Sequence, residues 1–173
     1  KIFVDLKFFD IPATVGRAIK ALSSKGVDMA TIHGNNSMME AATKDKGDLK
    51  VLAVTALTSL DRGDLDDLGF ECHIQELVLS RAKRALNIGC DGIVSSGLEV
   101  PMIRESLDHK LLVITPGVRP IDNRAEDDQK RVVSVEQAFQ NGADYIVVGR
   151  PIRDAEDSKA MAEKIQEQIA SQF

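Results

Sequence analysis

The chain has 173 residues, of which 43% are hydrophobic, and this composition suits one globular domain, residues 1–173, with an apolar core. Its formal net charge of −5, without a basic stripe, argues against nucleic acid as the main partner. No apolar run reaches the roughly 18 residues that a membrane-spanning helix needs, so we expect no membrane segment, and the first residues do not resemble a signal peptide.

Six apolar runs rich in β-branched residues predict strands, and amphipathic patterns between them predict helices. In chain order, the expected elements are a strand at 2–6, a helix at 14–25, a strand at 29–33, a helix at 37–43, a strand at 49–55, a helix at 74–87, a strand at 92–95, a helix at 100–107, a strand at 111–115, a helix at 135–141, a strand at 145–148 and a helix at 158–171. Such alternation indicates parallel strands joined by right-handed crossovers.

Three stretches repeat one pattern, in which a helix end and a glycine are followed by an aspartate and a buried strand. They read KGVDMATIH, IGCDGIVSS and NGADYIVVG. The sheet is therefore either open and doubly wound or closed into a barrel. No G-x-G-x-x-G follows the first strand, which argues against an open, doubly wound sheet that binds a dinucleotide.

Polar residues collect where the predicted strands end. They are Lys7, Asp10, His33, Thr58, Ser59, Ser95, Ser96, Arg119 and Arg150. Barrel enzymes keep their chemistry at this end, so we predict an α/β fold of the (β/α)8 TIM-barrel type. A full barrel has eight units in about 250 residues, whereas six units are visible here.

The first strand carries the charged residues Asp5 and Lys7, and Asp10 follows. On a regular strand Phe3, Asp5 and Lys7 share a face, so Asp5 and Lys7 can touch. Inside a barrel, an unpaired charge would lose its hydration at a cost of roughly several kcal/mol, so we expect the two residues to form a pair. The spacing alone fits a structural ion pair as well as a catalytic one. Asp10 could likewise be a helix cap.

The stretch VVGRPI, residues 147–152, places a glycine and an arginine directly after the last strand. Gly149 lets the backbone approach an anion closely, and Arg150 offers two parallel N–H groups. We expect a phosphate site here, because barrels often hold phosphate at their last two strands. The alternative is a surface arginine on an ordinary turn.

A long polar segment, TPGVRPIDNRAEDDQKRV, follows the fifth strand. A loop of this length is usually a lid or a binding loop rather than a simple connector. Arg119 and Gln129 could reach a ligand from it. Cys72 and Cys90 match no metal or redox spacing, and the three histidines do not pair at ligand spacing.

Taken together, the motifs DLKFFDIPATV, AVTALTS, TPGVRP, DDQKRV and VVGRPI resemble the orotidine 5'-monophosphate decarboxylase family, in its order and at plausible spacing. The resemblance implies a (β/α)8 barrel that needs no cofactor or metal and converts orotidine monophosphate to uridine monophosphate in pyrimidine biosynthesis. It also implies a cytoplasmic homodimer with its sites at the interface.

The resemblance further implies a role for each matching residue. Lys7 matches the lysine that protonates C6 of the pyrimidine ring, and Asp5 matches the aspartate beside it. Asp10 matches the aspartate lent to the other subunit's site, accompanied by Ile11 and Thr14. The remaining substrate-binding positions are Thr58, Ser59, Arg119, Gln129, Gly149 and Arg150.

One part of the family pattern is missing. The family's first strand carries an aspartate that contacts the ribose, and its second carries a lysine that completes the charge array. The six strands here therefore correspond to strands three to eight, which implies a domain that is incomplete at its N-terminal side.

Two alternatives remain. Magnesium-dependent sugar-phosphate decarboxylases and aldolases share the D-x-K-x-x-D pattern, although the continuation Asp10-Ile11-Pro12-Ala13-Thr14 and the loop carrying Gln129 favour the nucleotide enzyme. The second alternative is a nucleotide-binding fragment without catalytic activity.

Overall fold

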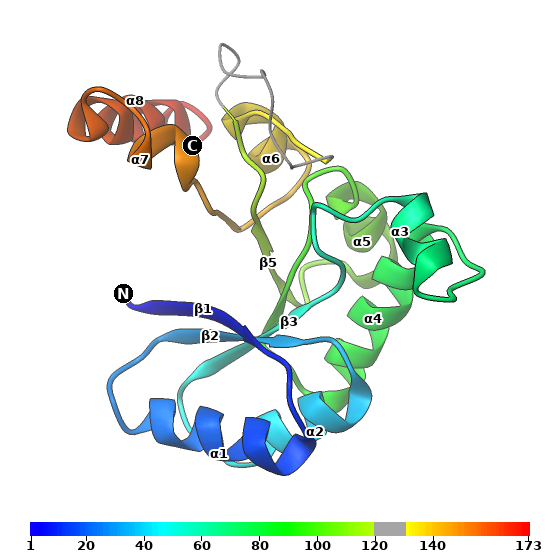
Figure 1. Cartoon of the computed structure of the whole chain (residues 1–173). Helices are drawn as coiled ribbons and strands as arrows, with labels where there is room; N and C mark the ends of the chain where they lie inside the picture. The colour runs from blue at the N-terminus through cyan, green and yellow to red at the C-terminus, as the bar shows by residue number, and fades with distance from the viewer. Residues whose placement is uncertain (120–130) are drawn as a thin grey trace.

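The computed structural model describes residues 1–119 and 131–173, in which parallel strands alternate with helices (Figure 1). The strands are β1 (Phe3–Phe8), β2 (Met29–His33), β3 (Lys50–Val54), β4 (Gly92–Val94), β5 (Leu112–Thr115) and β6 (Tyr145–Ile146). The helices are α1 (Pro12–Ser23), α2 (Asn36–Lys44), α3 (Arg62–Asp67), α4 (Ile74–Ile88), α5 (Val100–Leu107), α6 (Val135–Gln140), α7 (Arg150–Arg153) and α8 (Ser158–Ala170). The predicted strands and helices are confirmed to within a few residues. Only the short helices α3 and α7 were not expected.

The strands form one curved sheet in chain order, β1-β2-β3-β4-β5-β6, and each pairs in parallel with the next. Figure 1 shows the helices on the outer side of this curve, and the strand order places β1 and β6 at its two edges. Every connection can therefore run over one face, which leaves the carboxyl ends of the strands together at one rim.

Both faces of the central strands β2 to β5 are largely buried, which explains why these strands are nearly continuous apolar runs. The edge strands β1 and β6 are partly exposed. Ile32, Ala53 and Ile93 pack with the helices in the outer core. Leu52 and Val94 belong to a separate cluster on the inner face. The alternation of side chains along each strand thus separates an outer core from the inner wall of the half-barrel.

The three repeated aspartates have a common structural role. Each carboxylate accepts a hydrogen bond from a backbone N–H of the neighbouring strand or of the residue that precedes that strand. The pairs are Asp28 with Ile2 at 2.6 Å, Asp91 with Val51 at 2.8 Å and Asp144 with Val113 at 2.7 Å. Two of these carboxylates also form ion pairs, Asp91 with Lys46 at 2.9 Å and Asp144 with Arg104 at 2.7 Å.

Strand β1 departs from regular geometry at the residue that carries the predicted chemistry. Its register against β2 shifts between Val4 and Phe8, and Lys7 has a φ of 50°. The expected regular strand is therefore interrupted, although the expected shared face is kept, since Phe3 packs in the inner-face cluster and Lys7 still meets Asp5. A left-handed backbone at a residue other than glycine costs roughly 1–2 kcal/mol, and neighbouring contacts must supply that energy.

We expect Asp144→Ala to lower the free energy of unfolding by about 2 kcal/mol, because one carboxylate oxygen accepts from both Val113 and Arg104. Urea denaturation measures this loss. The matched control is Asp154→Ala, which removes an exposed carboxylate paired with Arg153 and should leave the midpoint unchanged. Equal midpoints for the two variants would show that Asp144 does not hold the strands together.

Candidate active site

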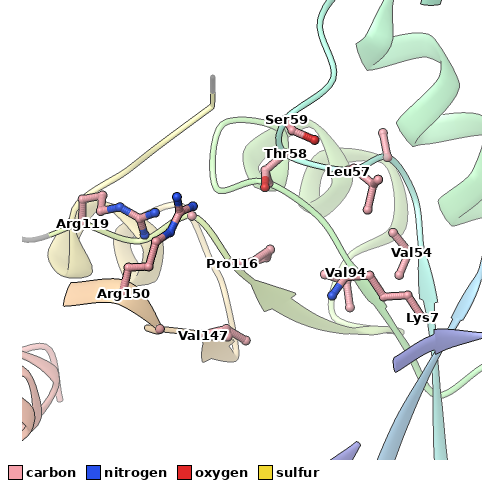
Figure 2. A pocket seen from close by; sticks show the side chains of 13 residues that line it. Lys7, Val54, Leu57, Thr58, Ser59, Val94, Pro116, Arg119, Val147 and Arg150 are labelled. Carbon is pink, nitrogen blue, oxygen red and sulfur yellow. The ribbon is translucent and has the colours of Figure 1, made fainter. Parts of the chain in front are cut away.

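A cavity of about 220 Å³ opens at the carboxyl ends of the strands (Figure 2). Six of the predicted site residues line it, namely Lys7, Thr58, Ser59, Arg119, Gly149 and Arg150. Apolar walls come from Val54, Val94 and Val147, with Leu57 and Pro116. The structure therefore brings together residues from both ends of the chain, as the barrel prediction required.

Lys7 stands on one side of this cavity and is paired with Asp5. The Lys7 Nζ lies 2.7 Å from Asp5 Oδ2, and both side chains are about one-third exposed, at 34% and 33%. The other carboxylate oxygen, Oδ1, accepts a hydrogen bond of 2.9 Å from the hydroxyl of Thr31. The predicted contact between Asp5 and Lys7 is confirmed, although the strand that carries it is irregular.

Arg119 and Arg150 stand on the opposite side of the cavity from Lys7, and Figure 2 shows their guanidinium groups close to one another. Arg119 is buried and follows β5, whereas Arg150 begins α7 after Gly149. A Cβ built on Gly149 would meet nothing within 4 Å, so this glycine leaves open space beside the arginines. Two adjacent guanidinium groups suit a ligand with two negative charges, such as a phosphate monoester.

Asp10, Ile11 and Thr14 lie away from this cavity, at the start of α1. The N-cap of α1 is Ile11, so the alternative that Asp10 caps the helix is wrong. The carboxylate of Asp10 instead accepts a hydrogen bond of 2.6 Å from the N–H of Ile11. Ile11 is 66% exposed, as is Phe9. Gln129 falls outside the described residues.

Arg131 is a residue that the sequence patterns did not single out. Its guanidinium lies 2.7 Å from Glu99 Oε1, in an ion pair whose side chains are only 9% and 2% exposed. It also donates a hydrogen bond of 2.7 Å to the carbonyl of Leu57, directly before Thr58. Through the hydrogen bond to Leu57, Arg131 links the segment after β5 to the loop after β3.

His33 does not line this cavity, although its place at a strand end made that possible. It lines a second cavity of about 330 Å³, which is mainly apolar and is bounded by Phe9, Leu60, Phe70 and Arg81, among others. Burial, and then the charges of Arg81 and Lys7, lower the pKa of His33 below its usual range. A neutral imidazole in edge contact with Phe9 fits a structural role.

Within residues 1–119 and 131–173, no group of three or more His, Cys, Asp or Glu side chains is arranged to hold a metal ion. In the same part of the chain, none of the helices has the length and apolar character needed to cross a membrane. Burial raises the pKa of the Cys90 thiol to about 12, which fits an unreactive core residue.

We expect Arg131→Met to destabilise the protein by about 3 kcal/mol, because it leaves the buried carboxylate of Glu99 without its cation. The double variant Arg131→Met with Glu99→Leu should be more stable than the single variant, since it removes the orphaned charge. Urea denaturation of both single variants and the double variant completes the cycle. Strictly additive losses would contradict an energetic coupling between the two side chains.

Comparison with known proteins identifies the family. A model of the family described as "Orotidine 5'-phosphate decarboxylase / HUMPS family" matches residues 1–165. Orotidine 5'-phosphate decarboxylase of Methylococcus capsulatus is 68% identical over 173 residues, which are 100% of this chain and 72% of that protein. The protein of the same name from Nitrobacter winogradskyi is 43% identical, over 98% of this chain and 71% of its own length.

Solved structures agree. The crystal structure of orotidine 5'-phosphate decarboxylase from Lactobacillus acidophilus superposes with a TM-score of 0.82 at 36% identity, covering 98% of this chain and 75% of that one. The enzyme of that name from Pyrococcus horikoshii has a TM-score of 0.75 at 23% identity, which supports the fold alone. The TIM-barrel prediction, with six strands in this chain, is confirmed, and the chain belongs to the orotidine 5'-phosphate decarboxylase / HUMPS family.

Proposed function

We propose that the chain decarboxylates orotidine 5'-monophosphate to uridine 5'-monophosphate, a step of pyrimidine biosynthesis. Its 68% identity to a decarboxylase of that name supports this activity. The observation that carries the proposal is the layout of the 220 Å³ cavity, with the Lys7–Asp5 pair on one side and two arginines on the other. A nucleotide monophosphate has the matching layout, with a reactive ring at one end and a dianion at the other.

At the ring end, the chemistry requires a cation. Loss of carbon dioxide from C6 leaves a pair of electrons in the plane of the ring, where the ring π system does not delocalise it. The ammonium group of Lys7 stabilises this developing charge and then delivers a proton to C6. Asp5 holds the ammonium in place through the 2.7 Å contact. The electrons of the broken C–C bond end in the new C6–H bond.

At the other end, Arg119 and Arg150 bind the phosphate, with Gly149 leaving room for it. Thr58 and Ser59, which line the cavity, contact the nucleotide. Gln129 is assigned a further phosphate contact from the resemblance to the family alone. Because the phosphate is remote from C6, its binding energy can support orientation and desolvation at the reacting carbon. We assign no cofactor or metal to this reaction.

The proposed active unit is a homodimer, in which Asp10, Ile11 and Thr14 reach the partner's site. Exposed apolar side chains at the end of β1 support this assignment, since Ile11 and Phe9 are each 66% exposed and Leu6 is 69% exposed. We also propose that β1 to β6 correspond to strands three to eight of an eight-stranded barrel domain, and that the protein acts in the cytoplasm without nucleic acid as a partner.

The alternatives have weaker support. The magnesium-dependent sugar-phosphate enzymes are not favoured, because the named relatives at high identity are orotidine 5'-phosphate decarboxylases. A nucleotide-binding fragment without activity predicts binding of uridine monophosphate but no turnover. Decarboxylation followed by ultraviolet absorbance in the presence and absence of EDTA separates these cases, because only a magnesium enzyme loses activity to the chelator and an inactive fragment shows no turnover in either condition.

We expect Lys7→Ala to lower kcat by more than about 10³-fold, because it removes both the cation and the proton donor. Binding of uridine monophosphate, measured by calorimetry, should persist, since the phosphate contacts remain. The control is Lys20→Ala on α1, which removes an exposed lysine 3.7 Å from Asp45 and should leave kcat unchanged. Near-normal turnover by Lys7→Ala would overturn the assignment of the proton donor.

The dimer proposal has its own test. Lys7→Ala and Asp10→Ala should each be inactive alone, but an equal mixture that exchanges subunits should recover about a quarter of the wild-type rate. Half of the dimers are then mixed, and each mixed dimer has one site with both residues intact. A mixture as inactive as its components would show that Asp10 serves its own subunit's site.

A further inference from the structure

Thr31 is a buried polar residue in the middle of β2, and its side chain is 0% exposed. In the register of the sheet it lies opposite Leu52, which belongs to the apolar cluster of the inner face. A hydroxyl in such a place loses hydration unless it finds hydrogen-bond partners. The two partners of Thr31 both belong to the pair of residues that carries the proposed chemistry.

The first partner is the carboxylate of Asp5. The hydroxyl of Thr31 donates to Asp5 Oδ1 at 2.9 Å, while Asp5 Oδ2 lies 2.7 Å from Lys7 Nζ. A carboxylate is planar, so fixing one oxygen sets the direction of the other. Without the bond to Thr31, the side chain of Asp5 can rotate in a site that is one-third open to water, and its contact with Lys7 is no longer fixed.

The second partner is the backbone of Lys7. The N–H of Lys7 donates to the hydroxyl oxygen of Thr31 at 2.9 Å, at the point where the register of β1 shifts. Lys7 has a φ of 50°, which a residue other than glycine adopts only when contacts hold it there. One hydroxyl group therefore holds both the backbone that projects the lysine and the carboxylate that receives its ammonium.

We propose that Thr31 is a positioning residue for the decarboxylation, acting through Asp5 and Lys7 and not by contact with the nucleotide. Thr31 is not among the residues that line the 220 Å³ cavity. The inference rests on the proposed function for its kinetic consequence, but its structural consequence is independent of the substrate. Loss of the hydroxyl should affect the reacting end of the cavity and leave the phosphate end intact.

The test compares Thr31→Val, which keeps the shape but removes the hydroxyl, with Thr31→Ser, which keeps the hydroxyl. The matched control is Thr55→Val, because Thr55 is equally buried and its hydroxyl donates to the carbonyl of Val94 rather than to the Lys7–Asp5 pair. If Thr31→Val does not fold, Thr31→Ala replaces it in the same measurements.

We expect Thr31→Val to lower kcat by about 10- to 100-fold with KM within about threefold of wild type, because misplacement of a catalytic group by about 1 Å has an effect of this size. Thr31→Ser should restore most of the rate, and Thr55→Val should match the wild type. A kcat for Thr31→Val equal to that of Thr55→Val, in an active wild type, overturns the positioning role and leaves the proposed function standing.

Crystal structures of the variants separate the two claims. In Thr31→Val the distance from Lys7 Nζ to Asp5 should exceed about 4 Å, the limit of an ion pair, whereas Thr31→Ser should keep the wild-type contact. A pair that stays intact in Thr31→Val overturns the inference, whatever the kinetics. A broken pair together with a wild type that neither decarboxylates the substrate nor binds uridine monophosphate supports the positioning role and overturns the proposed function.

Discussion

The sheet depends on one repeated hydrogen bond. In it, a carboxylate that precedes one strand accepts from a backbone N–H at or near the start of the neighbouring strand. Asp28, Asp91 and Asp144 each make this bond at the amino ends of the strands. The bond fixes how far one strand slides against the next, and a slip of one residue would exchange the inner and outer faces. The register of three of the five strand pairs, β1–β2, β3–β4 and β5–β6, is thus set at the rim opposite the active site.

Because the strands are held in register at their amino ends, residues from distant parts of the sequence are brought together at the carboxyl ends. Lys7, Thr58 and Arg150 come from the first strand, the loop after the third and the turn after the sixth, yet they line one cavity. The inner wall beneath them is apolar, with Leu52 and Val94 as members. The charged groups at the rim therefore stand above an apolar floor, which shields one side of a bound ligand from water and strengthens its electrostatic interactions.

The sequence allowed the fold and most of the cavity to be predicted, because buried parallel strands are apolar runs and their ends carry the polar residues. Three features were beyond its reach. Thr31 looks like an ordinary β-branched strand former, and only the pairing of β1 with β2 brings its hydroxyl to Asp5. Arg131 stands among other charges, and nothing in the pattern indicates that it pairs with the buried Glu99. The positive φ of Lys7 and the register shift beside it have no signature in the sequence pattern. The chemical roles of all the site residues, Lys7, Asp10 and Gln129 among them, stay predictions.

The exposure of the Lys7–Asp5 pair explains why hydrogen bonds, and not charge attraction alone, must set its geometry. With both side chains about one-third exposed, solvent screens the attraction, and exposed ion pairs contribute at most about 1 kcal/mol. A nucleotide that fills the cavity displaces this water, and the same charges then interact in a medium of lower dielectric constant. The ammonium must already point at the reacting carbon when that happens, because reorientation during the reaction would add to the barrier. The two bonds to Thr31, a residue that is itself fully buried, supply that orientation before the substrate binds.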